Sequence, residues 1–209
     1  LGAGSPAIGT AAGTGTDQRG INRITNDIGA YSFGIQVTNT TDNLTSPSVG
    51  SLRAAINLAN TTPGNDQISV NLTGANPYTI TLAGALPNIV SANTSVSGGT
   101  AGTVTITGLG ASNLNINGNL GVFSVFNIAF GGDLSISEVT VSGANNSSGN
   151  GGAFFNSGVL AISNSNLSGN TASSGAGVWN AGTLTLTNST LSGNTAAGLG
   201  FGSGLGGAI

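Results

Sequence analysis

Nine charged side chains are the groups of this chain that could carry acid–base or ion-binding chemistry. They are six carboxylates and three arginines in 209 residues, so charged residues make up 4% of the chain, whereas an average domain has about 25%. The chain has no histidine, cysteine, methionine or lysine. Imidazole bases, thiolate nucleophiles, lysine Schiff bases and the usual ligands of zinc, haem and iron–sulfur clusters are therefore missing together. We expect that the protein is not an enzyme, and we assign it no catalytic, cofactor-binding or metal-binding residue.

The positions of the charged residues support this expectation. Asp17 and Asp27 lie ten residues apart, and two carboxylates are too few for an all-protein calcium site. With Arg19 and Arg23 between them, a local network of ion pairs or turns is the preferred interpretation. Three arginines and a net charge of −3 also cannot supply the row of phosphate contacts that nucleic-acid binding needs, so nucleic acid is not an expected partner. No stretch approaches the roughly 20 apolar residues of a membrane-spanning helix.

A repeat of 24 residues organises the second half of the chain. Residues 151–173 align without a gap with residues 175–197, so that Asn156 matches Asn180. A third copy lies upstream at 134–144, at an offset of 26, and a fourth begins at Gly206. Leucines alternate with threonines inside the repeat, which predicts short strands. This period suits one three-sided coil of a parallel β-solenoid, in which matching residues of successive coils stack about 4.8 Å apart.

Stacked coils would bring matching side chains together. We predict a buried core in which residues of one coil lie on those of the next: Leu134, Ile136 and Val141; Leu160, Ile162 and Leu167; Leu184, Leu186 and Leu191. Two asparagine pairs, Asn164 with Asn188 and Asn170 with Asn194, are interpreted as turn residues or stacked amides in preference to ligand contacts. Phe155 and Trp179 match as well, and a stacked aromatic row is favoured over a sugar-binding platform.

One helix is expected before the coils. In the run 50–60, Ser51 can cap the first turn, and Leu52, Ala55, Ile56 and Ala59 form one apolar face. An amphipathic helix of this kind can cover the exposed end of a solenoid. Arg53 on this helix is interpreted as a surface charge or a member of a salt bridge. We divide the chain into a closing or junction segment (1–34), a strand with the capping helix (35–65) and β-helix coils (66–209) that form one continuous domain.

The motifs together resemble a known family. The run GSLRAAINLAN (50–60), the segment TITGLGASNLNINGN (105–119) and the NSxLSGNTA repeats are similar to secreted right-handed parallel β-helix proteins of bacteria, including cyanobacteria, with polymorphic-outer-membrane-protein-like repeats. In that family the helix usually begins Cys-Ser-Leu-Arg-Glu-Ala-Ile, whereas this chain has Gly50 for the cysteine and Ala54 for the glutamate. The resemblance implies an all-β, right-handed parallel β-helix with a short N-terminal capping helix, located outside the cell or on its surface.

The order of the motifs bears on assembly. Segments of the kind seen at 4–10, 16–20 and 27–31 close a unit in that family, whereas the helix opens one, and here the closing segment stands first. This order predicts one period of a longer array, either a covalent tandem or copies stacked end to end. The chain also begins without the basic and apolar regions of a signal peptide, which predicts a mature product or an excerpt.

Four functions follow in order of preference. The first is a structural subunit of an extracellular bacterial surface fibre, assembled from copies of itself through the β-helix edges. The second is an adhesin or autotransporter-type passenger that displays loops such as 145–151 and 197–203 to a surface or glycan. A polysaccharide lyase or hydrolase is less favoured, because only Asp133 and Glu138 follow Asp66 among the acids. Ice binding is a minor alternative, because the threonines at 183, 185 and 187 match Val159, Ala161 and Ser163 in the preceding coil.

Overall fold

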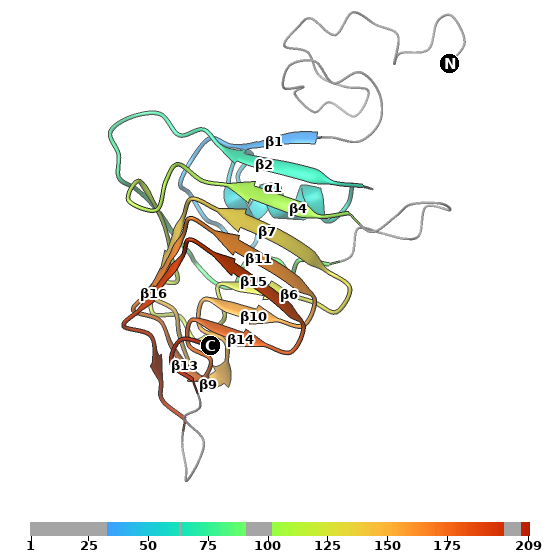
Figure 1. Cartoon of the computed structure of the whole chain (residues 1–209). Helices are drawn as coiled ribbons and strands as arrows, with labels where there is room; N and C mark the ends of the chain where they lie inside the picture. Colours follow the sequence, from blue (N-terminus) through green and yellow to red (C-terminus); the bar gives the residue numbers. More distant parts are fainter. Residues whose placement is uncertain (1–32, 63, 91–101, 199–205) are drawn as a thin grey trace, which may run out of the picture.

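Parallel strands in four sheets form most of the computed structural model, which describes residues 33–62, 64–90, 102–198 and 206–209 (Figure 1). The six-stranded sheet contains, in order, β1 (Phe33–Val37), β2 (Asp66–Val70), β4 (Val104–Thr107), β7 (Asp133–Ser137), β11 (Val159–Ser163) and β15 (Thr183–Thr187). The five-stranded sheet contains β3 (Tyr78–Thr81), β5 (Leu114–Asn117), β8 (Thr140–Ser142), β12 (Asn166–Ser168) and β16 (Thr190–Ser192). The aromatic sheet contains β6 (Phe126–Ile128), β10 (Phe154–Asn156) and β14 (Val178–Asn180). The β9 sheet contains β9 (Asn145–Asn150), β13 (Thr171–Ser174) and β17 (Thr195–Ala196).

Successive coils visit the sheets in the same order. From β7 the chain passes through β8, β9 and β10 before it returns to the six-stranded sheet at β11. All pairings between the named strands are parallel. The all-β, parallel β-helix expected from the sequence is therefore confirmed. The coil is not three-sided in this part of the chain, because Gly143 and Gly169 turn with positive φ and the extended residues after them pair as the β9 sheet.

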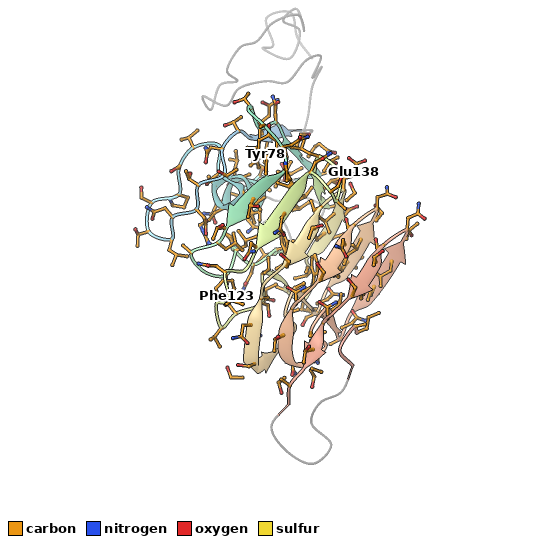
Figure 2. The ribbon with its side chains drawn as sticks, turned by 90° about the vertical axis from the view of Figure 1, so that its left-hand side faces the viewer. Tyr78, Phe123 and Glu138 are labelled. Atoms are coloured by element: carbon orange, nitrogen blue, oxygen red, sulfur yellow. The ribbon has the colours of Figure 1, made fainter. Side chains whose placement is uncertain are left out.

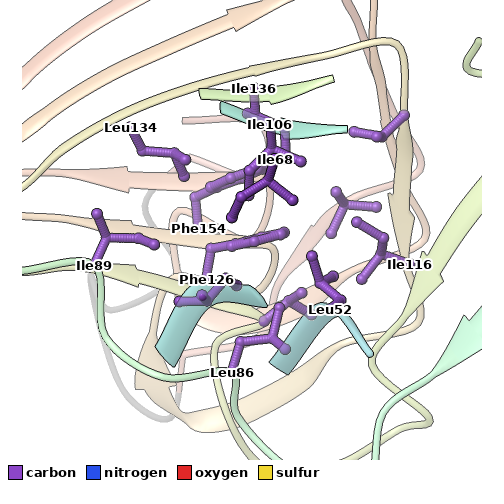
Figure 3. Packing of buried hydrophobic residues seen from close by; sticks show 14 of the residues in the cluster. Leu52, Ile68, Leu86, Ile89, Ile106, Ile116, Phe126, Leu134, Ile136 and Phe154 are labelled. Carbon is purple, nitrogen blue, oxygen red and sulfur yellow. The ribbon is translucent and has the colours of Figure 1, made fainter. Parts of the chain in front are cut away.

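The repeat predicts the register of the coils. Leu160 pairs with Leu184 on one side and with Leu134 on the other, and all three side chains point to the same core. The central inward column of the six-stranded sheet begins at Ile35 and continues through isoleucines to Leu186. Figure 3 shows Ile68, Ile106 and Ile136 from this column, one behind another. Stacking of identical β-branched side chains fills the core without a change of shape from coil to coil.

Burial of the predicted core differs between coils. Leu160, Ile162 and Leu167 are at most 1% exposed, as predicted. The matching leucines of β15 and β16 are only partly buried, so that part of the core prediction is wrong. In the described structure these strands have a neighbouring coil on one side only. A side chain at the edge of a stack loses half of its packing partners and keeps part of its surface in water.

The described residues contain one helix, α1 (Leu52–Ala59), which lies between β1 and β2 in the sequence and packs against both of them (Figure 1). Its cap is the expected one, because the Ser51 side chain accepts a hydrogen bond from the Ala54 N–H over 3.2 Å. The apolar face is buried as predicted: Leu52, Ala55, Ile56 and Ala59 are at most 2% exposed. The helix takes the place of the strands that later coils contribute to the other sheets, and it covers the core at this end.

Candidate functional site

A buried ion pair between Arg53 and Asp42 joins α1 to two loops. The Arg53 Nε donates to Asp42 Oδ1 over 2.6 Å, and Nη2 donates to Asp42 Oδ2 over 2.7 Å. The guanidinium also donates to the main-chain oxygens of Gly84 and Ala85, at 2.9 and 2.6 Å. The Arg53 and Asp42 side chains are 6% and 1% exposed. The salt-bridge interpretation of Arg53 is therefore confirmed and the surface location is wrong, because the carboxylate and two carbonyls satisfy the buried charge.

Two of the other described carboxylates accept hydrogen bonds from threonine hydroxyls. Asp66 Oδ1 accepts a hydrogen bond from the Thr62 hydroxyl over 2.7 Å, and Asp133 Oδ2 accepts one from the Thr103 hydroxyl over 2.9 Å. Glu138 lies at the margin of the five-stranded sheet (Figure 2), in a turn where its φ is +60°. Within the ranges that the structure describes, no three His, Cys, Asp or Glu residues gather closely enough to hold a metal ion. Four charged residues of the predicted N-terminal network lie outside the described residues: Asp17, Arg19, Arg23 and Asp27.

Asparagine side chains bridge neighbouring coils, which confirms the structural interpretation of these residues. Each bridge joins an amide nitrogen of one side chain to the amide oxygen of its match in the other coil. Two members, Asn164 and Asn188, also adopt positive φ of 49° and 51°, which asparagine tolerates better than most residues. The three bridges are Asn156 to Asn180 at 2.6 Å, Asn170 to Asn194 at 3.0 Å, and Asn188 to Asn164 at 3.3 Å. These amides tie the turns of one coil to those of the next.

Phe155 and Trp179 form the predicted stacked pair on the aromatic sheet. Their ring centroids lie 4.3 Å apart and their planes differ by 17°. Both rings are partly exposed, whereas the second stacked pair, Phe126 and Phe154, is fully buried with centroids 5.1 Å apart. Each of the two outer rings covers one face of the other, so these two facing sides are not available to a sugar ring. The stack therefore supports the structural interpretation and gives no argument for a glycan platform.

The segment chosen as a display loop is part of the β-helix. Residues 145–150 form β9, in which Asn145, Asn146 and Asn150 pair with β13 across a register shift, so the interpretation of 145–151 as a projecting loop is wrong. The Asn146 Nδ2 further donates to the main-chain oxygens of Asn150 and Gly151, at 2.9 and 3.1 Å. Most of the other proposed loop, 197–203, lies outside the described residues.

The outer face of the six-stranded sheet has two regular columns of mostly short, hydroxylated side chains, which we call the hydroxyl face. Residues of these columns alternate along each strand with the buried core residues. The first column is Ser69, Thr107, Ser137, Ser163 and Thr187, paired in register across five strands. The second column is Gln67, Thr105, Ser135, Ala161 and Thr185 across the same strands. Neither column contains a charged residue.

No family model, curated protein or solved structure matches this chain. Among the residues described, no helix has the length and apolarity needed to cross a membrane.

Sequence reasoning missed two features of these surfaces. It found no acidic partner for Arg53, since Asp42 lies 11 residues away in a loop without a repeat. It also missed the continuity of the hydroxyl face, because the strands before β11 do not follow the 24-residue spacing. The second feature carried a signal, namely the alternation of Ser or Thr with Ile, Leu or Val in the strand segments upstream of the repeats.

Proposed function

We propose that this chain is a structural unit of an extracellular bacterial fibre in which β-helix coils continue end to end. The observation that carries the proposal is the outer side of the coil that contains β15 and β16. Leu184, Leu186 and Leu191 point toward the core there but are only partly buried. Full burial of a leucine is worth about 1.5–3 kcal/mol relative to exposure. A coil laid on this side would therefore add stabilisation at each of the three leucines.

The main chain of β15 supports the same proposal. Thr183 donates its N–H to Gly158, and the Thr187 carbonyl accepts from the Asn164 N–H, so these residues direct their main-chain groups toward β11. Alternate residues of a parallel strand direct these groups to opposite sides, so those of Leu184 and Leu186 face away from β11. Such an edge is a template for one more parallel strand.

The other end of the six-stranded sheet supplies a strand that fits. β1 is its outermost described strand, and Ile35 occupies the same inward column as Leu186. Adding β1 of a neighbouring unit to β15 in this register would continue the aliphatic column. The two contact surfaces differ from each other, because α1 covers the core beside β1, so the contact is of the head-to-tail type that generates filaments.

Light scattering of the 209-residue chain over a concentration series, with electron microscopy of the same samples, tests this proposal. We expect a mass that rises with concentration and unbranched fibres. Leu186→Glu places a carboxylate in the contact and should reduce assembly, whereas Thr185→Glu adds the same charge to the outward side of the same strand. A chain that stays monomeric at every concentration, or equal effects of the two substitutions, would contradict assembly through this edge.

A further inference from the structure

The hydroxyl face lies on the side of the β-helix, away from the edges that the fibre proposal uses. From β2 to β15 the register of the six-stranded sheet has no slip, so its two columns run straight across five strands. Neighbouring strands are about 4.8 Å apart, and residues two positions apart along a strand are about 6.6 Å apart. The columns therefore form a two-dimensional lattice of side-chain oxygens, broken in its interior only by Ala161.

The spacing of this lattice suits water. Hydroxyl oxygens about 4.8 Å apart are too far from each other for a direct hydrogen bond, which needs about 2.8 Å between oxygens. One tetrahedral water that bonds to both of two oxygens holds them about 4.6 Å apart at that bond length. This is also the distance between second-neighbour oxygens in a tetrahedral water network. The difference of roughly 0.2 Å per strand adds up to about 0.8 Å over the four steps of a column.

The hydroxyls of the first column are available for such bonds. Within the part of the chain that the structure describes, the side chains of Ser69, Ser137 and Ser163 make no hydrogen bond to protein. Thr107 accepts one, from the Gln67 Nε2 over 3.1 Å. The inward neighbours of these residues are almost fully buried, which fixes the main chain that carries the lattice. A fixed main chain lowers the conformational-entropy cost of ordering the hydroxyls when water binds to them.

Charge distinguishes the partners that this face can take. The lattice itself is neutral, and the nearest carboxylates, Asp133 and Glu138, stand at the two ends of β7. A neutral lattice matches a neutral partner, whereas anionic lipids, nucleic acid and acidic glycans require cations that the face does not have. The face also lacks an aromatic ring against which a neutral sugar could pack. The partner with matching charge and spacing is ordered water.

We propose that the hydroxyl face binds ice, by holding a layer of water whose oxygens continue into the crystal. The minor ice-binding alternative considers the threonines of β15, which do not continue in the strand before it, because Val159, Ala161 and Ser163 stand there instead. The register shows that the hydroxyls resume at β7 and continue to β2. The lattice is thus longer than the sequence repeat indicates.

Ice recrystallisation and thermal hysteresis, measured on the purified 209-residue chain, test the proposal. We expect growth of ice grains to be inhibited by the native sequence. Ser137→Tyr projects a ring from the middle of the lattice and should raise the inhibitory concentration by about tenfold or more, because a single protrusion separates the whole flat face from the crystal. Ser142→Tyr is the control on the five-stranded sheet: Ser142 points outward and is similarly exposed, and the substitution also removes the 2.8 Å hydrogen bond that its hydroxyl donates to Asn115 Oδ1. Ala161→Thr fills the gap in the second column and should lower the inhibitory concentration.

Three results would overturn the inference. The first is a native chain that inhibits no more than an equal mass of a non-binding control protein. The second is the same loss of activity in Ser137→Tyr and Ser142→Tyr at equal native far-UV circular dichroism. The third is binding to microcrystalline cellulose or chitin that depends on Ser137 without any effect on ice, which would assign the face to a neutral polysaccharide. Ala161→Thr provides an independent test if a tyrosine variant fails to fold. If this variant inhibits ice growth no better than the native chain, the result also contradicts ice binding by the hydroxyl face. Fibre assembly depends on Leu186 instead, so the two proposals fail separately.

Discussion

Truncation of two matched leucines measures how stability is distributed along the stack. Leu160 and Leu184 occupy the same inward position in adjacent coils, but Leu160 is fully buried and Leu184 is partly exposed. Leucine-to-alanine changes in filled cores cost about 2.7–5 kcal/mol, and the cost grows with the cavity that remains. Leu160 has stacked neighbours on both sides, so we expect Leu160→Ala to cost about 3–5 kcal/mol. Leu184 has one stacked neighbour and can be replaced in part by water, so Leu184→Ala should cost about 1–2 kcal/mol.

Hydrogen exchange resolved to individual coils is the appropriate assay, because a stack unfolds locally and a single melting temperature would average the effect. Leu160→Ala should lower protection in β7, β11 and β15, whereas the effect of Leu184→Ala should be confined to β15 and β11. Equal costs at the two positions would refute the assignment of Leu184 to an uncovered side. In samples that have formed fibres, the cost of Leu184→Ala should rise toward that of Leu160→Ala, since a further coil would then cover it.

Three other substitutions test separate contacts. Asp42→Ala leaves the Arg53 guanidinium buried without its carboxylate and should lower the free energy of unfolding, measured by chemical denaturation, by about 3–5 kcal/mol. A smaller loss in the double variant with Arg53→Leu would confirm that the unpaired charge is responsible. Glu138→Asn puts asparagine at a positive-φ position that the next two coils already fill with asparagine, so the free energy of unfolding should rise by roughly 0.5–1 kcal/mol, and a fall would contradict this reading of the turn. Trp179→Ala removes the partner of Phe155 and should cost about 0.5–1.5 kcal/mol beyond the lost apolar burial, with Trp179→Phe recovering most of it in thermal melts.

The sequence predicts the fold because one repeat contains both the strand pattern and its register. An ungapped match of 24 residues places Leu160 on Leu184, and the structure pairs these two residues. The helix was also predictable, since Ser51 and the apolar face are local signals that need no partner from elsewhere in the chain. Ile162, predicted from the repeat, and Ile56, predicted from the apolar face of the helix, are both buried in the core.

Other features depend on contacts that no local pattern reports. Asp42 reaches Arg53 because the loop after β1 folds back over α1, and loop paths follow from tertiary packing. The β9 sheet is rich in asparagine, serine and threonine, and within a single coil such residues predict a turn. They form strands here because the same segments of neighbouring coils pair with one another. The partial burial of Leu184 likewise reflects its position in the stack and cannot be read from the repeat, which treats every coil as equal.

Inward and outward residues alternate along each strand of the six-stranded sheet. The proposed fibre contact therefore uses inward leucines at the end of the stack, whereas the proposed ice contact uses the outward residues on its side. From β2 to β15 every second residue of the six-stranded sheet points inward, and all of these residues except Asp66 are aliphatic, because they must stack on the coil before them. The residues between them are free of that requirement, yet from β2 to β15 most of them are short and hydroxylated, with Gln67, Asp133, Val159 and Ala161 as the exceptions. Core packing alone would tolerate charged or long side chains at Ser137 or Ser163, since these point to solvent. Within the two columns of the hydroxyl face, hydroxyls stand on all but two of the ten positions, and the proposed binding of ordered water supplies a requirement for flat, short side chains there.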